Sequence, residues 1–354
     1  MDERSLLIQL CRCHPKGKES RSIADLASQV RWDTVLDLGT RHDLLPLLHS
    51  SLQSLRLLSG SVPGEVTSKL ERRRYAWVAG YSLFENELGR IRSAAEAKGA
   101  PFMVLKGPVL GALVYEDVSL RSFTDIDLVI RPEHRRRVRE ILTGLGYQFM
   151  RRKDQEEDYY LREVRGPGGQ INRLWVDVHH RMDINMRLRG RRYDLGEIWR
   201  NSVAWMSEYC RRPGWEDFLC HLATHASLDF YPRFILVCDI DRLVRRCKDL
   251  DWDRLLRKAR EYRCRIDVWL ALWLASSLLD TPVPAQMVNT LGRGDPRRAV
   301  IEHALGGERI FSERAGSLGR IPLRLATTDR LFELPGILLR YARLFAEHLC
   351  VSGS

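Results

Sequence analysis

The chain of 354 residues contains no long apolar run and no internal repeat. The longest apolar run, residues 268–279 (VWLALWLASSLL), falls short of the roughly 18 residues that a membrane span needs, so it predicts a core helix instead. Near the N-terminus, the segment SLLIQLCRCHPKGK carries its positive charges after a short apolar stretch, which is not the order found in secretory signals. We therefore expect a cytoplasmic protein that does not span a membrane.

The sequence also lacks paired cysteine motifs. Its eight cysteines form no C-x-x-C pair and are scattered through segments with a helical apolar pattern. This distribution favours buried, reduced thiols over disulfides or a zinc site. The cysteines are Cys11, Cys13, Cys210, Cys220, Cys238, Cys247, Cys264 and Cys350.

Basic residues outnumber acidic ones. The chain has 57 Lys and Arg against 46 Asp and Glu, which gives a formal charge of +11. Such a surplus favours polyanionic partners such as RNA or nucleotides. A GC-rich genome would produce the same arginine bias, so the charge alone leaves the kind of partner open.

The apolar pattern changes twice along the chain. From residue 22 to 52 and from 65 to 98, apolar residues recur every three or four positions, which predicts that residues 1–98 form a helical segment. Residues 99–184 carry short β-rich runs at 102–105, 126–130, 159–164 and 171–179, with RGPGGQ as a hairpin turn and helices near 108–115 and 132–145. Residues 185–354 have helical patterns again. We expect an α+β protein: a mixed sheet with flanking helices, between an N-terminal helical segment and a C-terminal all-helical domain.

Two aspartates stand one residue apart in the stretch SFTDIDLVI. Strand alternation places Asp125 and Asp127 on one face, and VDVHH places Asp177 and His179 on one face of another strand. For an isolated D-x-D, a turn cap and a surface ion pair are the commoner explanation. Three carboxylates on neighbouring strands instead favour a hard divalent cation, Mg²⁺ or Mn²⁺. They predict a two-metal phosphoryl-transfer site, in which Asp177 is also a candidate base.

Candidate phosphate-binding residues lie just upstream. The stretch MVLKGPVL runs from a strand through Lys106 and Gly107 into a helix, and the free N–H groups at a helix start can hold phosphate. Arg121 and Ser122 add a second cation and a hydroxyl immediately before the aspartate pair. These four residues predict a site for the phosphates of a nucleoside triphosphate (NTP). We expect ATP as the nucleotide, but the sequence does not determine which base is used.

Together these motifs resemble the uncharacterised bacterial nucleotidyltransferase family of the polymerase-β-like superfamily. The resemblance rests on LKGPVL, RSFTDIDLVI, LGY and VDVHHRM, continues through CHLATHA and LDWDRLLRKAR, and covers roughly residues 20–275. It implies a nucleotidyltransferase core that uses Mg²⁺ and an NTP, with Asp125, Asp127 and Asp177 as the metal-binding and catalytic aspartates. It implies transfer of a nucleoside monophosphate, with release of pyrophosphate, to an acceptor that is left open: RNA or tRNA, a peptide, or a small molecule. The alternative is a non-catalytic NTP-binding protein that retains the pocket.

The chain departs from the superfamily pattern at one turn. The superfamily has Gly-Ser or Gly-Gly where this chain has Gly107-Pro108, and proline lacks the N–H that would contact phosphate. We expect Lys106 to compensate for the missing donor.

Other acidic and histidine pairs have simpler explanations. CDID and LDWD repeat the D-x-D spacing in helical segments, where residues two apart do not share a face, so we expect helix caps and ion pairs. His221 and His225 lie four apart on a predicted helix, but no glutamate follows the first histidine as in zinc proteases. We expect them to pack or hydrogen-bond at a domain interface, and a substrate contact stays open.

Three segments are rich in arginine: residues 131–140, 150–153 and 186–192. They predict either solvated surface or the rim of a cleft for a polyanionic acceptor such as tRNA. The sequence does not choose between the two.

Overall fold

The computed structural model describes residues 3–13, 18–58, 60–153, 157–165, 171–182, 193–228, 231–295 and 297–311. The expected hairpin turn at 166–170, the arginine-rich segment 186–192, Cys350 and a helical pattern near the C-terminus lie outside these residues. The described residues contain no helix with the length and apolar character that a bilayer crossing requires.

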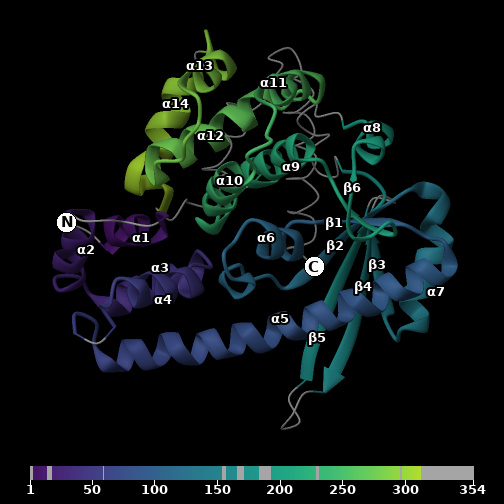
Figure 1. Ribbon diagram of the computed structural model, residues 1–354, viewed down its shortest axis with the longest axis horizontal. Coiled ribbons are helices and arrows are strands. Elements are labelled where there is room, and N and C mark those ends of the chain that lie inside the picture. Colours follow the sequence, from purple (N-terminus) through teal and green to yellow (C-terminus); the bar gives the residue numbers. More distant parts are fainter. Residues whose placement is uncertain are drawn as a thin grey trace, which may run out of the picture.

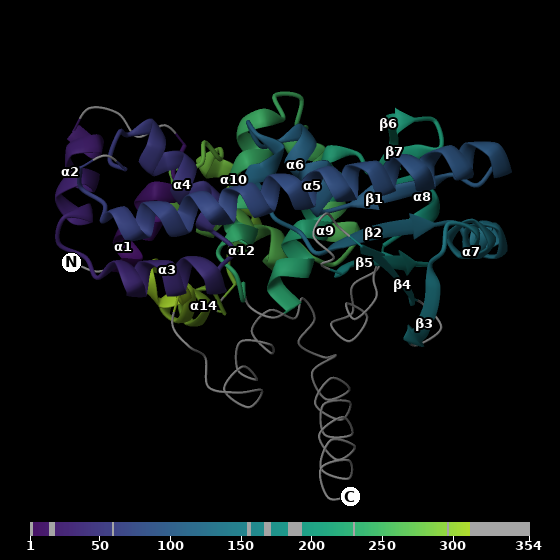
Figure 2. The same ribbon diagram turned by 90° about the horizontal axis from the view of Figure 1, so that it is seen from below.

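The N-terminal segment is helical, as the periodicity predicted. It comprises α1 (Glu3–Cys11), α2 (Lys18–Ala27), α3 (Trp32–Arg41), α4 (Leu45–Ser54) and α5 (Gly64–Lys98). The 35-residue α5 runs along the whole length of the molecule (Figures 1 and 2). It ends where Gly99 takes a left-handed conformation (φ +60°), which glycine adopts without a steric penalty.

Among the described residues, seven strands form one mixed sheet in the order β3-β4-β5-β2-β1-β7-β6. The strands predicted from alternation are present within a few residues, as β1 (Phe102–Leu105), β2 (Asp125–Ile130), β4 (Glu157–Arg165) and β5 (Ile171–His179). β2 pairs antiparallel with β1 and parallel with β5. The expected α+β fold with flanking helices is thus confirmed.

Three strands were not predicted: β3 (Gln148–Lys153), β6 (Val203–Ser207) and β7 (Cys210–Arg212). The expectation that residues 185–354 are all helical is therefore wrong at 203–212, because β7 pairs parallel with β1 and extends the central sheet. The hairpin is short and one strand face is largely exposed, so its apolar alternation is weak. The segment boundaries at 98/99 and 184/185 stay predictions.

Different helices cover the two faces of the sheet. α5 and α7 (Arg135–Gly144) lie on one face, since Arg162 of β4 pairs with Glu87 of α5 at 2.5 Å and Asp158 pairs with Arg135 of α7 at 3.4 Å. Residues 157, 159, 177 and 179 point to the opposite face, because neighbours alternate along β4 and β5. This opposite face meets α9 (Trp215–Leu228) and α10 (Ile235–Arg246).

The remaining helices complete one continuous core. They are α6 (Gly107–Leu113), α8 (Leu195–Arg200), α11 (Trp252–Glu261), α12 (Arg265–Leu279), α13 (Ala285–Gly292) and α14 (Arg297–Leu305), with the short 3-10 turns η1 (Val118–Leu120), η2 (Pro132–His134) and η4 (Gly307–Phe311). The predicted core helix at 268–279 is α12, which is buried along most of its length. Buried apolar residues from all three segments form a single cluster. The described cysteines are free thiols, as expected, and all but Cys13 are buried.

Candidate active site

Strand pairing gathers the three predicted aspartates. Asp127 of β2 stands directly opposite Asp177 of the parallel strand β5, and Asp125 lies two residues back on the same face. One carboxylate oxygen from each residue lies within 4.8 Å of the others. The structure therefore forms the carboxylate cluster that the sequence predicted.

Negative charge is crowded in this cluster. Burial raises the pKa of Asp177 to about 7, and the charges of Asp127 and Asp125 add to the effect. Burial, followed by the charge of Asp127, also raises the pKa of Asp125. Two of the three carboxyls thus resist ionisation in the absence of a further cation. Oxygen donors of this kind and number fit a hard divalent ion.

Asp127 is the exception because it has cationic and hydrogen-bonding partners. Its Oδ1 accepts a hydrogen bond from Lys106 Nζ at 2.9 Å and lies 2.8 Å from His179 Nε2. Burial alone would raise the pKa of Asp127, but Lys106 and His179 together hold it well below its ordinary value. Asp127 therefore keeps its charge, and its orientation is fixed from two sides.

A buried glutamate continues this arrangement. Glu157 of β4 pairs with His179 in the sheet register, and its Oε1 lies 3.3 Å from His179 Nδ1. The imidazole thus bridges two carboxylates, which fixes its ring plane. From the sequence, His179 was placed on one strand face with Asp177 but given no role. Glu157 was not identified, because its only signal is its register with β5.

The turn after β1 positions Lys106. Leu105 pairs with Asp127 across β1 and β2, so the next residue passes beside that carboxylate. Lys106 has φ +53°, a left-handed conformation that costs energy for any residue except glycine. Burial would lower the pKa of Lys106, but the charge and hydrogen bond of Asp127, together with the charges of Asp125 and Asp177, outweigh burial and raise the pKa. The ammonium is therefore retained next to the carboxylates.

Gly107 is required by close packing. A Cβ at this position would lie 2.5 Å from Cβ of Phe123, nearer than side-chain atoms approach one another. The turn can thus fold against Phe123 only with glycine at its second residue. Its predicted contact with phosphate stays a prediction.

Arg121 and Ser122 line the same pocket, of about 170 Å³, as Lys106 and the first two aspartates. Arg121 is buried and donates to both carboxylate oxygens of Asp239, from Nε at 2.7 Å and from Nη2 at 2.9 Å. Its charge is therefore already compensated. Ser122 Oγ is buried and has no hydrogen-bond partner within the described part of the chain. The phosphate-binding roles of both residues stay predictions.

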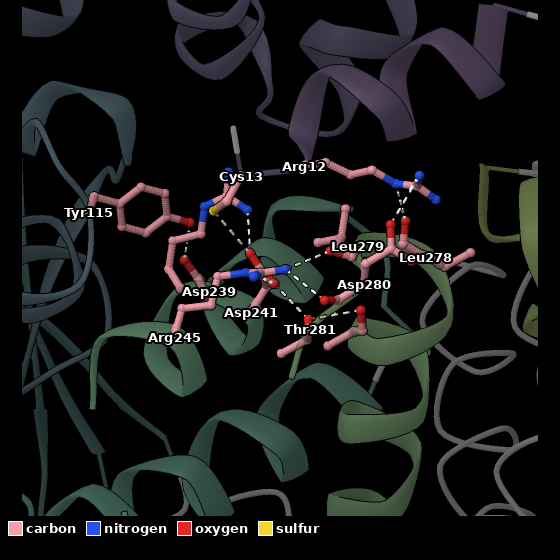
Figure 3. A network of polar contacts seen from close by, with 12 residues as sticks. Arg12, Cys13, Tyr115, Asp239, Asp241, Arg245, Leu278, Leu279, Asp280 and Thr281 are labelled. Carbon is pink, nitrogen blue, oxygen red and sulfur yellow. Dashed lines mark hydrogen bonds and ion pairs between the residues drawn. The ribbon is translucent and has the colours of Figure 1, made fainter. Parts of the chain in front are cut away.

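Asp239 belongs to a polar network on α10, drawn in Figure 3. It accepts a hydrogen bond from Tyr115 at 2.7 Å, while Asp241 accepts one from Thr281 at 2.6 Å and pairs with Arg245 at 2.7 Å. These contacts tie the loop before β2 to the helical domain. The expectation that this D-x-D serves ion pairing is confirmed.

The second helical D-x-D was expected to serve as a cap. Asp251 caps α11 by accepting a hydrogen bond from the Arg254 N–H at 2.9 Å. This part of the expectation is also confirmed.

The helical segments on both sides of the sheet region bring further groups to the pocket. His225 of α9 lines it, as do Arg233 and Asp43, which form an ion pair at 2.7 Å. The ring of His221 lies 6.2 Å from that of His225, and burial followed by the charge of Lys106 lowers the pKa of His221 to about 3. Lys106, followed by burial, lowers the pKa of His225 well below its ordinary range. Both histidines are therefore neutral at pH 7.

The arginine-rich segment 131–140 lies away from the carboxylates. It belongs to the face of the sheet that α7 covers, where Arg136 pairs with Glu140 at 3.0 Å and Arg135 with Asp158. None of its residues lines the carboxylate pocket as described. Arg131, Glu133 and Arg135 instead line a separate surface pocket beside α8.

Comparison with known proteins gives one extensive match. Residues 28–280 match a family described as uncharacterised nucleotidyltransferase. No curated protein matches the chain.

Among solved structures, a solution structure of the antibiotic-resistance factor ANT(2″)-Ia is 18% identical and covers 53% of this chain and 93% of its own, with a TM-score of 0.35. A crystal structure of ANT(2″)-Ia with adenylyl-2″-tobramycin is 18% identical and covers 51% and 97%, with a TM-score of 0.32. An antigenic nucleotidyltransferase-like protein from Paracoccidioides brasiliensis is 15% identical and covers 56% and 92%, with a TM-score of 0.35.

Proposed function

Because the chain belongs to the uncharacterised nucleotidyltransferase family, and is thus a transferase, we propose that it moves a nucleoside monophosphate from an NTP to an acceptor. The acceptor oxygen bonds to the α-phosphorus, the bond between the α- and β-phosphates breaks, and pyrophosphate leaves. The observation that carries the proposal is the cluster of Asp125, Asp127 and Asp177 within 4.8 Å, beside Lys106. ATP is the expected nucleotide.

The three aspartates would hold Mg²⁺ or Mn²⁺. The raised pKa of Asp125 and of Asp177 supports this assignment, because Lys106 contacts Asp127 and leaves the other two carboxyls without a direct cationic partner within the described residues. When bound, divalent ions would neutralise part of the triphosphate charge and lower the pKa of the acceptor hydroxyl, as in two-metal sites.

The protein's own side chains have distinct tasks in this proposal. Lys106 and His179 hold Asp127 ionised and in one orientation. Lys106 directly precedes α6, and its ammonium lies beside Asp127, where it would also contact the phosphates. Asp177 is the candidate base for the proton of the acceptor hydroxyl. Its pKa of about 7 belongs to the metal-free cluster, and a bound divalent ion would lower it.

The acceptor class is open between a nucleic acid, such as the end of a tRNA, and a peptide or small molecule. The charge of +11 favours a polyanion. Residues 131–140 do not line the carboxylate pocket. Their arginines therefore give no support for a polyanionic acceptor at this site.

A transfer assay tests the proposal. The purified protein would be incubated with Mg²⁺, each of the four NTPs labelled at the α-phosphate, and a cell lysate that is afterwards separated into RNA, protein and small-molecule fractions. Label that enters one fraction with the wild type, and not with Asp125→Asn, supports transfer and identifies the acceptor class. Nucleotide that binds without labelling any fraction, and without release of pyrophosphate, would favour a binding protein instead.

A further inference from the structure

A second, aromatic pocket adjoins the carboxylate pocket. It has a volume of about 230 Å³ and lies between α5 and the segment that leads into β2. Its aromatic wall consists of Trp77, Tyr81 and Phe84 from α5, together with Phe123. Tyr81 and Phe84 do not line the carboxylate pocket.

The two pockets are continuous through shared residues. Trp77, Arg121, Ser122 and Phe123 line both of them. Phe123 also packs directly on Gly107, at the turn where the sequence predicts the triphosphate. A ligand with its phosphates at this turn would therefore have the aromatic pocket beside it.

The aromatic rings form a preordered wall. The ring of Phe123 lies 4.9 Å from that of Phe84 and 6.1 Å from that of Tyr81, with an edge-to-face arrangement for Tyr81. Packing of these rings against one another holds Phe123 in place without a ligand. Planar heterocycles stack on such surfaces with little dependence on their identity.

Two polar atoms of the pocket residues lack partners. Trp77 Nε1 and Ser122 Oγ are both buried, and neither has a hydrogen-bond partner in the part of the chain that is described. A buried donor without a partner is costly, so such atoms are expected to meet a ligand or water. Ring nitrogens and exocyclic groups of a nucleobase offer acceptors and donors that match them.

We propose that this aromatic pocket binds the nucleobase of the NTP, while its triphosphate lies at the turn formed by Lys106 and Gly107. The assignment rests on the proposed nucleotidyl transfer, because it needs an NTP at the carboxylates. It makes Trp77, Tyr81, Phe84 and Phe123 the residues that bind the base.

Gly80 offers a way to fill the pocket without touching the carboxylates. It lines the pocket, and a Cβ at this position would meet nothing within 4 Å. Leucine is also a better helix former than glycine, so Gly80→Leu should fold normally. Gly89 lies on the same helix with equally open surroundings and lines neither pocket, which makes Gly89→Leu the matched control.

The experiment compares two ligands in the presence of Mg²⁺: the NTP that the wild type binds most tightly of the four, and inorganic tripolyphosphate, which has no base. Gly80→Leu should weaken NTP binding roughly fivefold to 150-fold, the range expected for the loss of one stacked base. It should leave the Kd of tripolyphosphate unchanged. Gly89→Leu should change neither constant, and Trp77→Leu should weaken NTP binding.

The outcomes distinguish failure of the base pocket from failure of the proposed nucleotidyl transfer. Unchanged NTP binding by Gly80→Leu and Trp77→Leu, or equal weakening of both ligands, overturns the base pocket and leaves nucleotidyl transfer standing. A wild type that binds neither ligand overturns the nucleotide site itself, and the base pocket with it.

Discussion

Neutralising Asp177 should stabilise the metal-free protein. In the unfolded chain its carboxyl ionises near 3.8, whereas in the folded protein burial and the neighbouring aspartates raise its pKa to about 7. Each pKa unit corresponds to about 1.36 kcal/mol, so the ionised group costs on the order of 4 kcal/mol at pH 8. Asp177→Asn removes that cost. At roughly 2 °C or more per kcal/mol, Tm should rise by about 5–10 °C.

The effect should depend on pH in a defined window. Below pH 3.8 the carboxyl is protonated in both states and costs nothing. As the pH rises from 3.8 to about 7, the unfolded chain ionises while the folded protein keeps its proton, so wild-type stability falls relative to the variant. The advantage of Asp177→Asn should therefore be small at pH 4 and constant above about pH 8.

The assay is thermal unfolding in EDTA at a series of pH values, followed by tryptophan fluorescence. Asp249→Asn, at an exposed position, is the control and should show no such trend. Asp127→Asn should have the opposite sign at neutral pH, because its partner Lys106 would lose a carboxylate. A lower Tm of Asp177→Asn, or a gain in Tm that does not vary with pH, would refute the claim that the crowded carboxylates destabilise the folded protein. Mg²⁺ should raise the Tm of the wild type more than that of Asp177→Asn.

Two further variants test the groups around Asp127. Lys106→Met should raise the KM for the NTP about tenfold or more, because the proposed charge-assisted hydrogen bond from Lys106 to the phosphates would be lost. An unchanged KM would show that Lys106 does not bind the NTP. His179→Gln should raise the Mg²⁺ concentration for half-maximal activity roughly 10- to 100-fold, since partners that orient ligands have effects of this size. If the Mg²⁺ requirement stays the same, His179 does not position Asp127.

Within a single strand, the sequence was enough to predict which site residues share a face. The period of two along a strand determines that Asp125 and Asp127 share a face, and that Asp177 and His179 do too. Four strands of the sheet were predicted for the same reason, because each has an apolar run or an alternation over at least four residues.

The pairing between strands was not predictable in the same way. Glu157 reaches His179 only because β4 and β5 pair in one particular register. The strands β6 and β7 have five and three residues, which is too short for alternation to stand out. Their place beside β1 is decided by tertiary contacts.

Ion pairs between distant segments also lack a local signal. Arg121 meets Asp239 across 118 residues, and Arg233 meets Asp43 across 190. From the sequence, Arg121 was assigned to phosphate binding because it stands just before the aspartate pair. Only the folded chain shows that a carboxylate already compensates its charge.

Asp125→Asn is the most direct test of the central claim. Because the pKa of Asp125 is already raised, its neutralisation should not lower Tm, so any loss of transfer cannot be ascribed to unfolding. Pyrophosphate release would be measured for the wild type and the variant with the responsive acceptor fraction, Mg²⁺ and the preferred NTP. The account predicts a loss of at least about 100-fold with an unchanged or higher Tm. Release at the wild-type rate by Asp125→Asn would contradict the carboxylate site.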